Sequence, residues 1–268
     1  MGRALVHSIL SPPLGTGVGL RASPNPRRIF LARQPLNRAP VRGDFSKTHV
    51  NRNFRDRTEG GAQLAALLRS YAGTNNAIVL ALPRGGVPVG AAVARALRLS
   101  LDVFVVRKLG LPGQPELAMG AIATGGVRVL NDDVVDSLQL PDRVIDTVAE
   151  RESRELARRE KLYRGERPMP DVAHKTVILV DDGIATGSTM LAAIRSLRIL
   201  GAEKIIVATP VIAHGTLALL ESAADDVVSV LTPYDFYGVG QWYENFTQTT
   251  DDEVRALLGE NERQISAE

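Results

Sequence analysis

The stretch "VILVDDGIATGST", residues 177–189, joins the pattern of a buried strand to two carboxylates and a loop of small residues. Four apolar residues run directly into Asp181 and Asp182, and glycine and hydroxyl-bearing residues follow. A strand that is apolar throughout is typical of a parallel sheet covered on both faces, where ligands bind at the carboxyl ends of the strands. The stretch therefore predicts a fold class and the edge of the sheet that carries the site.

Other apolar runs along the chain support this fold class. They span residues 77–82, 101–106, 176–180, 204–209 and 227–231. Helical patterns separate most of them, each with apolar residues on one face. These residues are Leu64, Leu67, Leu68 and Tyr71 in the first helix, Val89, Val93 and Leu97 in the second, and Met190, Ile194 and Leu197 in a later one. The alternation predicts an α/β fold with an open, mainly parallel five-stranded sheet and helices on both faces.

Three segments lie outside this alternation. Residues 120–130 predict a hairpin around Gly125 and Gly126. Residues 141–164 predict a heavily charged helix with few apolar anchors, so we expect most of its surface to be solvated. The tail from residue 232 onward holds many of the aromatic residues and the only tryptophan. We expect it to form a small C-terminal hood that caps the core or lines a pocket.

Residues 1–43 differ in composition from the rest of the chain. They contain seven arginines, no acidic residue and six of the 15 prolines, without sustained periodicity. This composition predicts a disordered or loosely attached leader, which is similar to an organelle transit peptide or is an extension upstream of the true start. The expected organisation is a leader at 1–45, a core at 46–231 and the hood at 232–268.

Composition excludes several classes of site and partner. The chain has no cysteine, which excludes disulfides, thiolate metal sites and cysteine nucleophiles. Its four histidines lack metal-ligand spacing, and no apolar run is long enough for a membrane span. The net charge of +2 comes with no basic stripe interleaved with aromatics, so no nucleic acid partner is expected. We expect a soluble cytoplasmic protein, unless residues 1–43 direct it to an organelle.

The loop after the two carboxylates has the chemistry of an anion site. Backbone N–H groups from Ala185 to Thr189, and the hydroxyls of Thr186, Ser188 and Thr189, precede the start of a helix. Gly187 lets the backbone approach a ligand closely. The carboxylates would repel a phosphate unless they accept hydrogen bonds from a pair of sugar hydroxyls. The stretch thus predicts a sugar phosphate site, and a capped turn in an ordinary strand-to-helix connection is the alternative.

Residues 177–189 resemble the phosphoribosyl pyrophosphate motif of the type I phosphoribosyltransferases. In that motif an apolar strand leads into two acids, two mostly apolar residues and a loop of small hydroxylated residues. Gly183 departs from it, because an aliphatic residue is common at that position. The strings "LPRGG" (82–86) and "RKLGLPGQPELAMG" (107–120) extend the resemblance, which covers residues 54–231 and is closest to a subgroup whose acceptor is undefined.

The resemblance implies specific roles for the two acids and the loop. Asp181 and Asp182 would hold the ribose 2- and 3-hydroxyls, and the loop from Ala185 to Thr189 would cradle the 5-phosphate. The turn after the first strand would bind pyrophosphate, with charge from Arg84 and exposed backbone at Gly85 and Gly86. For that turn alone, an ordinary tight turn is the alternative.

Residues 107–120 correspond by the same resemblance to the family's mobile catalytic loop. Arg107 and Lys108 would neutralise pyrophosphate as it leaves, although solvated charges at a strand end are the alternative. Glu116 would contact substrate or magnesium, or would pair with a neighbouring arginine.

The implied reaction transfers the 5-phosphoribosyl group from phosphoribosyl pyrophosphate to an unidentified nitrogen acceptor, with release of pyrophosphate. Magnesium (Mg²⁺) would be held by the ligand and waters rather than directly by protein side chains. A non-catalytic sensor of phosphoribosyl pyrophosphate or of a nucleotide is the competing interpretation, and a phosphatase or phosphorylase acting on sugar phosphates is a weaker one. A homodimer is left open.

Overall fold

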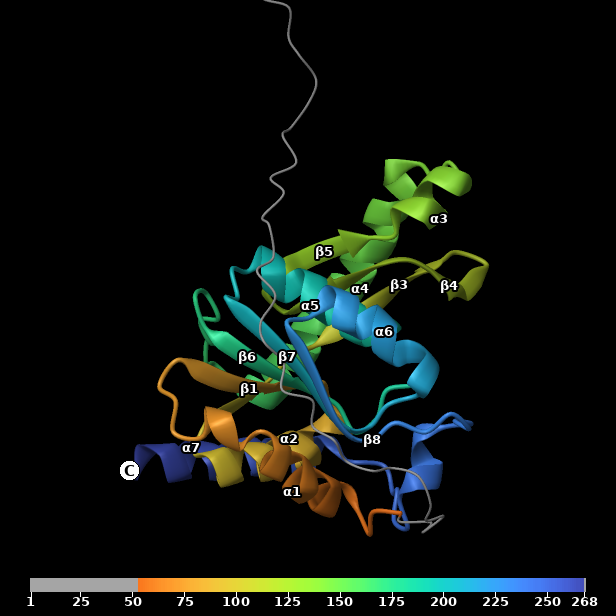
Figure 1. The fold of residues 1–268 in the computed structure, drawn as a ribbon. Coiled ribbons are helices and arrows are strands. Elements are labelled where there is room, and N and C mark those ends of the chain that lie inside the picture. The colour runs from red at the N-terminus through yellow and green to blue at the C-terminus, as the bar shows by residue number, and fades with distance from the viewer. Residues whose placement is uncertain (1–52, 268) are drawn as a thin grey trace, which may run out of the picture. The chain divides into compact units, whose positions relative to one another are not determined.

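The main sheet contains five parallel strands in the order β2-β1-β6-β7-β8, as Figure 1 shows. The structure, a computed structural model, describes residues 53–267, so the leader expected at 1–45 lies outside the described residues. The strands are β1 (Ala77–Ala81), β2 (Ser100–Val103), β6 (Thr176–Val180), β7 (Lys204–Val211) and β8 (Asp226–Leu231). The predicted fold class is confirmed, and each strand overlaps its predicted apolar run.

Helices cover both faces of this sheet, which is why its strands are mainly apolar. Side chains alternate along a strand, so Val79 and Ala81 face one side while Ile78 and Leu80 face the other. The first side packs against α1 (Arg57–Leu67) and α2 (Gly86–Leu97), and the second against α5 (Ser188–Ile199) and α6 (His214–Ala223).

Helix α1 differs from its predicted apolar face at one position. Leu64 and Leu68 are fully buried, but Leu67 is 55% exposed. A Cβ at Gly61 would lie only 2.7 Å from the Val89 carbonyl oxygen, so α1 contacts α2 through a glycine where the backbones come close. The buried stripe therefore passes through Gly61 rather than Leu67. Tyr71 is partly buried in the short 3₁₀ helix Arg69–Tyr71 that follows.

A second, antiparallel sheet contains β3 (Val106–Leu111), β4 (Gln114–Ala123) and β5 (Val127–Leu130). The predicted hairpin around Gly125 and Gly126 is confirmed, because both residues have positive φ in the 3₁₀ turn Thr124–Gly126 that joins β4 to β5. The loop expected at 107–120 instead forms most of a β3–β4 hairpin. Glycine and proline suggested a loop here, but they occupy its irregular register and its turn.

Helix α4 (Asp142–Arg164) follows the short helix α3 (Asp132–Ser137) and is less solvated than expected. Besides apolar anchors, it buries two charged residues, Glu152 and Arg164. Arg164 Nε lies 2.9 Å from Asp102 Oδ1, and its guanidinium also donates to the Val103 carbonyl. Burial raises the pKa of Asp102, and the adjacent Arg164 charge opposes this rise. The ion pair fixes the end of α4 to the end of β2.

The C-terminal segment closes the edge of the main sheet. Helix α7 (Asp251–Ser266) packs against α2, α4 and β2. Asn261 accepts a hydrogen bond from Leu101 N at 2.8 Å and donates one to Leu99 O at 3.1 Å, so it satisfies backbone groups along the edge strand. The 3₁₀ helix Val239–Trp242 precedes α7. Within residues 53–267, the helices are too short or too polar to cross a membrane.

We predict that Arg164→Ala lowers the free energy of unfolding by about 3–5 kcal/mol, because it leaves the buried Asp102 carboxylate without its partner. Arg158→Ala is the matched control on the same helix, since Arg158 is 60% exposed and pairs with Glu155 at the surface. The control should change stability by less than about 1 kcal/mol. Chemical denaturation measures both variants, and equal losses would contradict the structural role given to Arg164.

Candidate functional site

Two turns meet at the carboxyl ends of β1 and β6, which are neighbours in the sheet. A Cβ at Gly85 would lie 2.0 Å from Asp182 Oδ2, and a Cβ at Gly86 would lie 2.8 Å from the Val180 carbonyl oxygen. Only glycine fits at either position. The Pro83–Arg84 peptide bond in this turn is cis. The structure thus brings the predicted turn after β1 into contact with the predicted acid pair after β6.

Arg57 holds one of the two acids. Its Nε donates to Asp182 Oδ2 at 2.8 Å, and the two side chains are only 11% and 13% exposed. The Arg57 guanidinium also lies over the Phe246 ring at 3.9 Å and donates to the Thr247 carbonyl at 2.7 Å. Sequence reasoning gave no role to Arg57. The signal available was its place in "FRDR" at the start of helix α1, but nothing in that string indicates a contact with Asp182.

Asp181 has no such cation. Its Oδ1 accepts a hydrogen bond from Asp182 N at 2.9 Å, and among the described residues no lysine, arginine or histidine lies within ion-pair distance of its carboxylate. Burial and then the Asp182 charge raise the pKa of Asp181 well above its ordinary value. Burial also raises the pKa of Asp182, while Arg57 opposes that rise. Hydroxyl donors from a ligand would relieve the cost of keeping this pair ionised.

The loop after the acid pair is open to solvent at the start of α5. Ala185, Thr186, Ser188 and Thr189 are exposed. Gly187 has a φ of +75°, which favours glycine, and a Cβ there would also lie 2.8 Å from Thr216 Cγ2. The start of a 12-residue helix therefore presents hydroxyls and backbone N–H groups together, as an anion site requires.

Gly183, the departure from the family pattern, lies under the C-terminal segment. A Cβ at this position would be 2.3 Å from Val239 Cγ1. Nearby, the Tyr243 hydroxyl donates to the Asp182 carbonyl oxygen at 2.5 Å, and burial raises the Tyr243 pKa. Val239 thus fills the space that an aliphatic side chain at 183 would take, and the tail closes over the turn that carries the acids.

The side chain of Arg84 lies near the start of α7. Its Nη1 is 3.9 Å from Asp251 Oδ1, and the Tyr163 hydroxyl donates to the same oxygen at 2.7 Å. Burial and this hydrogen bond raise the pKa of Tyr163 to about 12. Arg84 is 34% exposed and its ion pair is long, so little holds its guanidinium in place.

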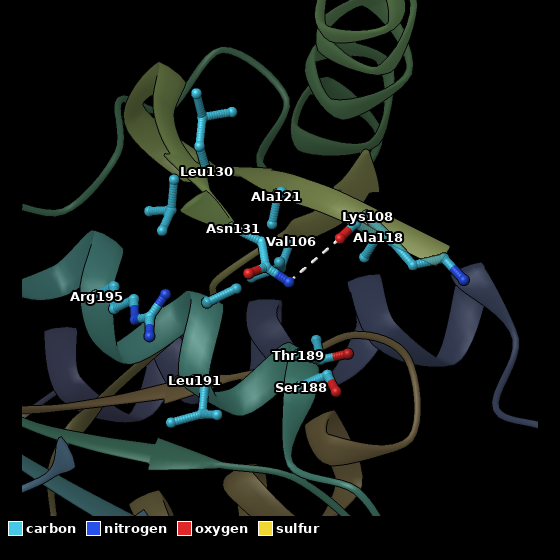
Figure 2. A pocket seen from close by; sticks show the side chains of 13 residues that line it. Val106, Lys108, Ala118, Ala121, Leu130, Asn131, Ser188, Thr189, Leu191 and Arg195 are labelled. Atoms are coloured by element: carbon cyan, nitrogen blue, oxygen red, sulfur yellow. Dashed lines mark hydrogen bonds between the residues drawn. The ribbon is translucent and has the colours of Figure 1, made fainter. Parts of the chain in front are cut away.

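Lys108 and Arg107 are adjacent in β3, so their side chains lie on opposite sides of the strand. Lys108 lines a cleft together with Ser188 and Thr189 of the anion loop (Figure 2). Its ammonium also pairs with Glu116 Oε2 at 3.1 Å, and Glu116 is 97% exposed. Lys108 therefore borders the anion loop, whereas Glu116 lies at the exposed end of the hairpin and pairs with a lysine instead of an arginine.

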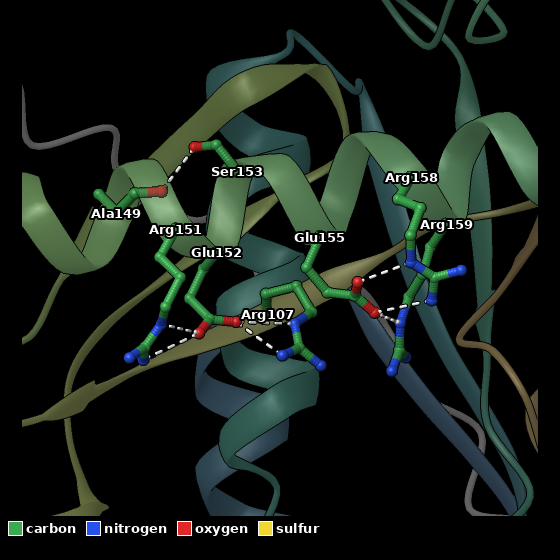
Figure 3. Close-up of polar contacts among 8 residues, drawn as sticks. All are labelled: Arg107, Ala149, Arg151, Glu152, Ser153, Glu155, Arg158 and Arg159. Carbon is green, nitrogen blue, oxygen red and sulfur yellow. Dashed lines mark hydrogen bonds and ion pairs between the residues drawn. The ribbon is translucent and has the colours of Figure 1, made fainter.

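Arg107 is bound to helix α4 instead (Figure 3). Its Nη2 and Nε lie 2.6 Å and 3.0 Å from Glu152 Oε2, and Arg151 contacts the other oxygen of Glu152. The Arg107 guanidinium is thus on the α4 side of the hairpin, and the structure shows no contact between it and the acid pair. Glu152 thus takes up the Nε and Nη2 groups of Arg107 in this structure.

Within residues 53–267, no group of three or more His, Cys, Asp or Glu side chains is placed to hold a metal ion. The acid pair supplies two carboxylates. Mg²⁺ commonly binds through one or two carboxylates while phosphates and waters supply its other oxygens. Asp181 and Asp182 fit a magnesium ion that arrives with a phosphorylated ligand.

Comparison with protein families gives a match over most of the described chain. The Phosphoribosyl transferase domain matches residues 54–244. A Mycobacterium tuberculosis (strain H37Rv) protein named "Putative phosphoribosyl transferase" is 47% identical over 213 residues, which are 80% of this chain and 48% of the relative. The chain therefore spans about half the length of this curated relative.

Similarity also extends to a solved structure and to a short segment of a kinase. A crystal structure from Thermus thermophilus superimposes with a TM-score of 0.70 and 40% identity, covering 78% of this chain and 98% of that one. A 59-residue segment is 48% identical to the ribose-phosphate pyrophosphokinase of Pyrococcus furiosus, covering 21% of each chain.

We predict that Asp181→Asn raises the melting temperature at pH 7 by a few degrees, since it removes a partly buried carboxylate without a cationic partner. A stabilisation of 1 kcal/mol corresponds to about 2–4 °C at this chain length. Because the pKa of Asp181 is raised in the folded state, its carboxylate is protonated at a higher pH in the folded wild type than in the unfolded chain. The advantage of the variant should therefore shrink as pH falls through that raised pKa toward 3.8.

Thermal unfolding followed by circular dichroism at several pH values measures this difference. Asp252→Asn is the control, because the Asp252 side chain is 84% exposed at the start of α7. A variant at position 181 that melts at or below the wild-type temperature across the whole range would contradict the cost assigned to the Asp181 carboxylate.

Proposed function

We propose that this chain, which belongs to the phosphoribosyl transferase family, transfers the 5-phosphoribosyl group of phosphoribosyl pyrophosphate to a nitrogen acceptor and releases pyrophosphate. The packing of the Gly85–Gly86 turn on Asp181 and Asp182 carries this proposal. That packing puts the acid pair between the turn at 83–86 and the exposed loop at 185–189. A sugar with a phosphate at one end and a pyrophosphate at the other matches this arrangement.

The acids hold the sugar in this proposal. Arg57 occupies Asp182 Oδ2, and the Asp182 backbone N–H occupies Asp181 Oδ1. One oxygen of each carboxylate is left to accept a hydrogen bond from a ribose hydroxyl. Arg57 is thus a positioning residue that fixes the orientation of Asp182, and the loop at 185–189 binds the 5-phosphate through its N–H groups and hydroxyls.

Transfer breaks the bond from the anomeric carbon to pyrophosphate and forms a bond to the acceptor nitrogen. The electron pair leaves on pyrophosphate, so positive groups near that oxygen stabilise the transition state. The backbone of the turn at 83–86, Arg84 and Lys108 supply such groups, and Arg107 joins them when it exchanges Glu152 for pyrophosphate. Magnesium, bound through ligand oxygens beside the acid pair, would neutralise further charge on the leaving group.

A sensor of phosphoribosyl pyrophosphate or of a nucleotide is the second candidate. One observation favours it: Arg107 is held by two hydrogen bonds to Glu152 and is not at the acid pair. A protein that binds the ligand without turning it over needs the acids and the anion loop, but it does not need Arg107 at the leaving group.

We predict that phosphoribosyl pyrophosphate with magnesium binds wild type and that Asp181→Asn/Asp182→Asn weakens this binding at least tenfold. Each hydrogen bond to a charged acceptor contributes about 1.5–3 kcal/mol, and about 1.4 kcal/mol corresponds to a factor of ten. Isothermal titration calorimetry measures the affinity, with Asp252→Asn as the control. Equal affinities in wild type and the double variant would contradict the role of the acids.

Pyrophosphate release separates the enzyme from the sensor. Wild type is incubated with phosphoribosyl pyrophosphate, magnesium and a panel of purines, pyrimidines and small amines, and the products are followed by phosphorus NMR. Release of pyrophosphate with an acceptor in the panel supports transfer. Tight binding with no release across the panel supports the sensor, and release of inorganic phosphate alone would indicate a phosphatase.

A further inference from the structure

A cleft of about 260 Å³ lies between α5 and the small sheet β3–β4–β5 (Figure 2). Its lining includes none of Asp181, Asp182 and Arg84, so it is not the pocket of the acid pair. It adjoins the anion loop through Ser188 and Thr189. The roles proposed above leave the rest of this cleft unused.

The two walls of the cleft have different shapes. On one side, Ser188, Leu191, Ala192 and Arg195 share a single face of α5, as their spacing of three, four and seven residues requires. On the other side, β4 contributes only small residues, Ala118, Gly120 and Ala121, while β5 contributes Leu130. The small residues create the hollow, and Leu130 and Leu191 give it apolar surfaces.

The two charged side chains that line the cleft are both cations, and the Lys108 ammonium is already paired with Glu116. Figure 2 shows the Arg195 guanidinium at one end, the Lys108 ammonium at the other and the Asn131 amide between them. No Asp or Glu lines the cleft. Among the described residues Arg195 has no acidic partner within ion-pair distance, whereas Arg198, one turn further along α5, pairs with Asp225 at 2.6 Å. Arg195 is therefore available to an anion that enters the cleft.

We propose that this cleft binds a single-ring compound that carries a carboxylate, with the carboxylate on Arg195 and the ring between Leu130 and Leu191. The volume lies just below the range of about 300–1,000 Å³ that is usual for ligand pockets, which favours one ring over a nucleotide. One guanidinium matches the geometry and single charge of a carboxylate, through two parallel hydrogen bonds. Asn131 supplies an amide to polar atoms on the ring.

Benzoate tests the site, and benzamide is the uncharged probe of the same shape. Each is titrated into nitrogen-15-labelled protein and followed by NMR. Benzoate should shift amide signals of β4, β5 and α5 and bind at least tenfold more tightly than benzamide. Arg195→Gln should remove this preference, Arg195→Lys should retain part of it, and Arg198→Gln, the control on the same helix, should leave it unchanged.

Two results would overturn the proposal: benzoate and benzamide binding equally well to wild type, or benzoate binding equally well to wild type and Arg195→Gln. Ala192→Leu, which fills the cleft from the helix side, gives an independent check and should weaken both probes. The site does not rest on the proposed function, and titration of phosphoribosyl pyrophosphate keeps the two apart. Arg195→Gln should bind that ligand as wild type does, whatever the outcome with benzoate.

Discussion

The contact between Gly85 and the Asp182 carboxylate is the constraint on which the candidate site depends. It requires glycine after β1, a carboxylate after β6 and an arginine on α1 that keeps this carboxylate oriented. The C-terminal segment joins through Tyr243, whose hydroxyl donates to the Asp182 carbonyl. Four segments that are distant in the sequence therefore converge on one residue. The two partly buried acids raise the free energy of the folded state, which is common where a protein keeps groups for a ligand and not for stability.

The sheet was predictable because its signal is local. Strands covered on both faces are mainly apolar, and short runs of that kind are visible without knowledge of the fold. The errors arose where a distant partner decides the outcome. Leu67 is exposed because Gly61 makes the close contact with α2, and Arg164 is buried because Asp102 lies beneath it. Residues 107–120 form a hairpin because β3 pairs with β4 and β4 pairs with β5, and this pairing outweighs their glycine and proline content.

In the candidate site, too, the features with a local sequence signal were predictable and those set by distant residues were not. The acids and the loop at 185–189 form one continuous stretch, so their order alone indicated an acid pair followed by an anion loop. Arg57 and Val239 could not be found by that reasoning, because they reach the stretch only through tertiary contacts. The sequence also could not predict which way the side chains of Arg84 and Arg107 point. Arg84, in the turn after β1, pairs with Asp251 on α7, and Arg107, in β3, pairs with Glu152 on α4; sequence spacing does not reveal either pair.

The most direct test of the central claim compares ribose 5-phosphate with 2-deoxyribose 5-phosphate. Both carry the phosphate that the loop at 185–189 would bind, but the second lacks a hydroxyl that would donate to the acid pair. If the acids face the sugar, calorimetry will show that loss of the 2-hydroxyl weakens binding about tenfold or more, as expected for a hydrogen bond to a charged acceptor. Equal affinity of the two sugar phosphates would contradict the claim that Asp181 and Asp182 face the sugar hydroxyls.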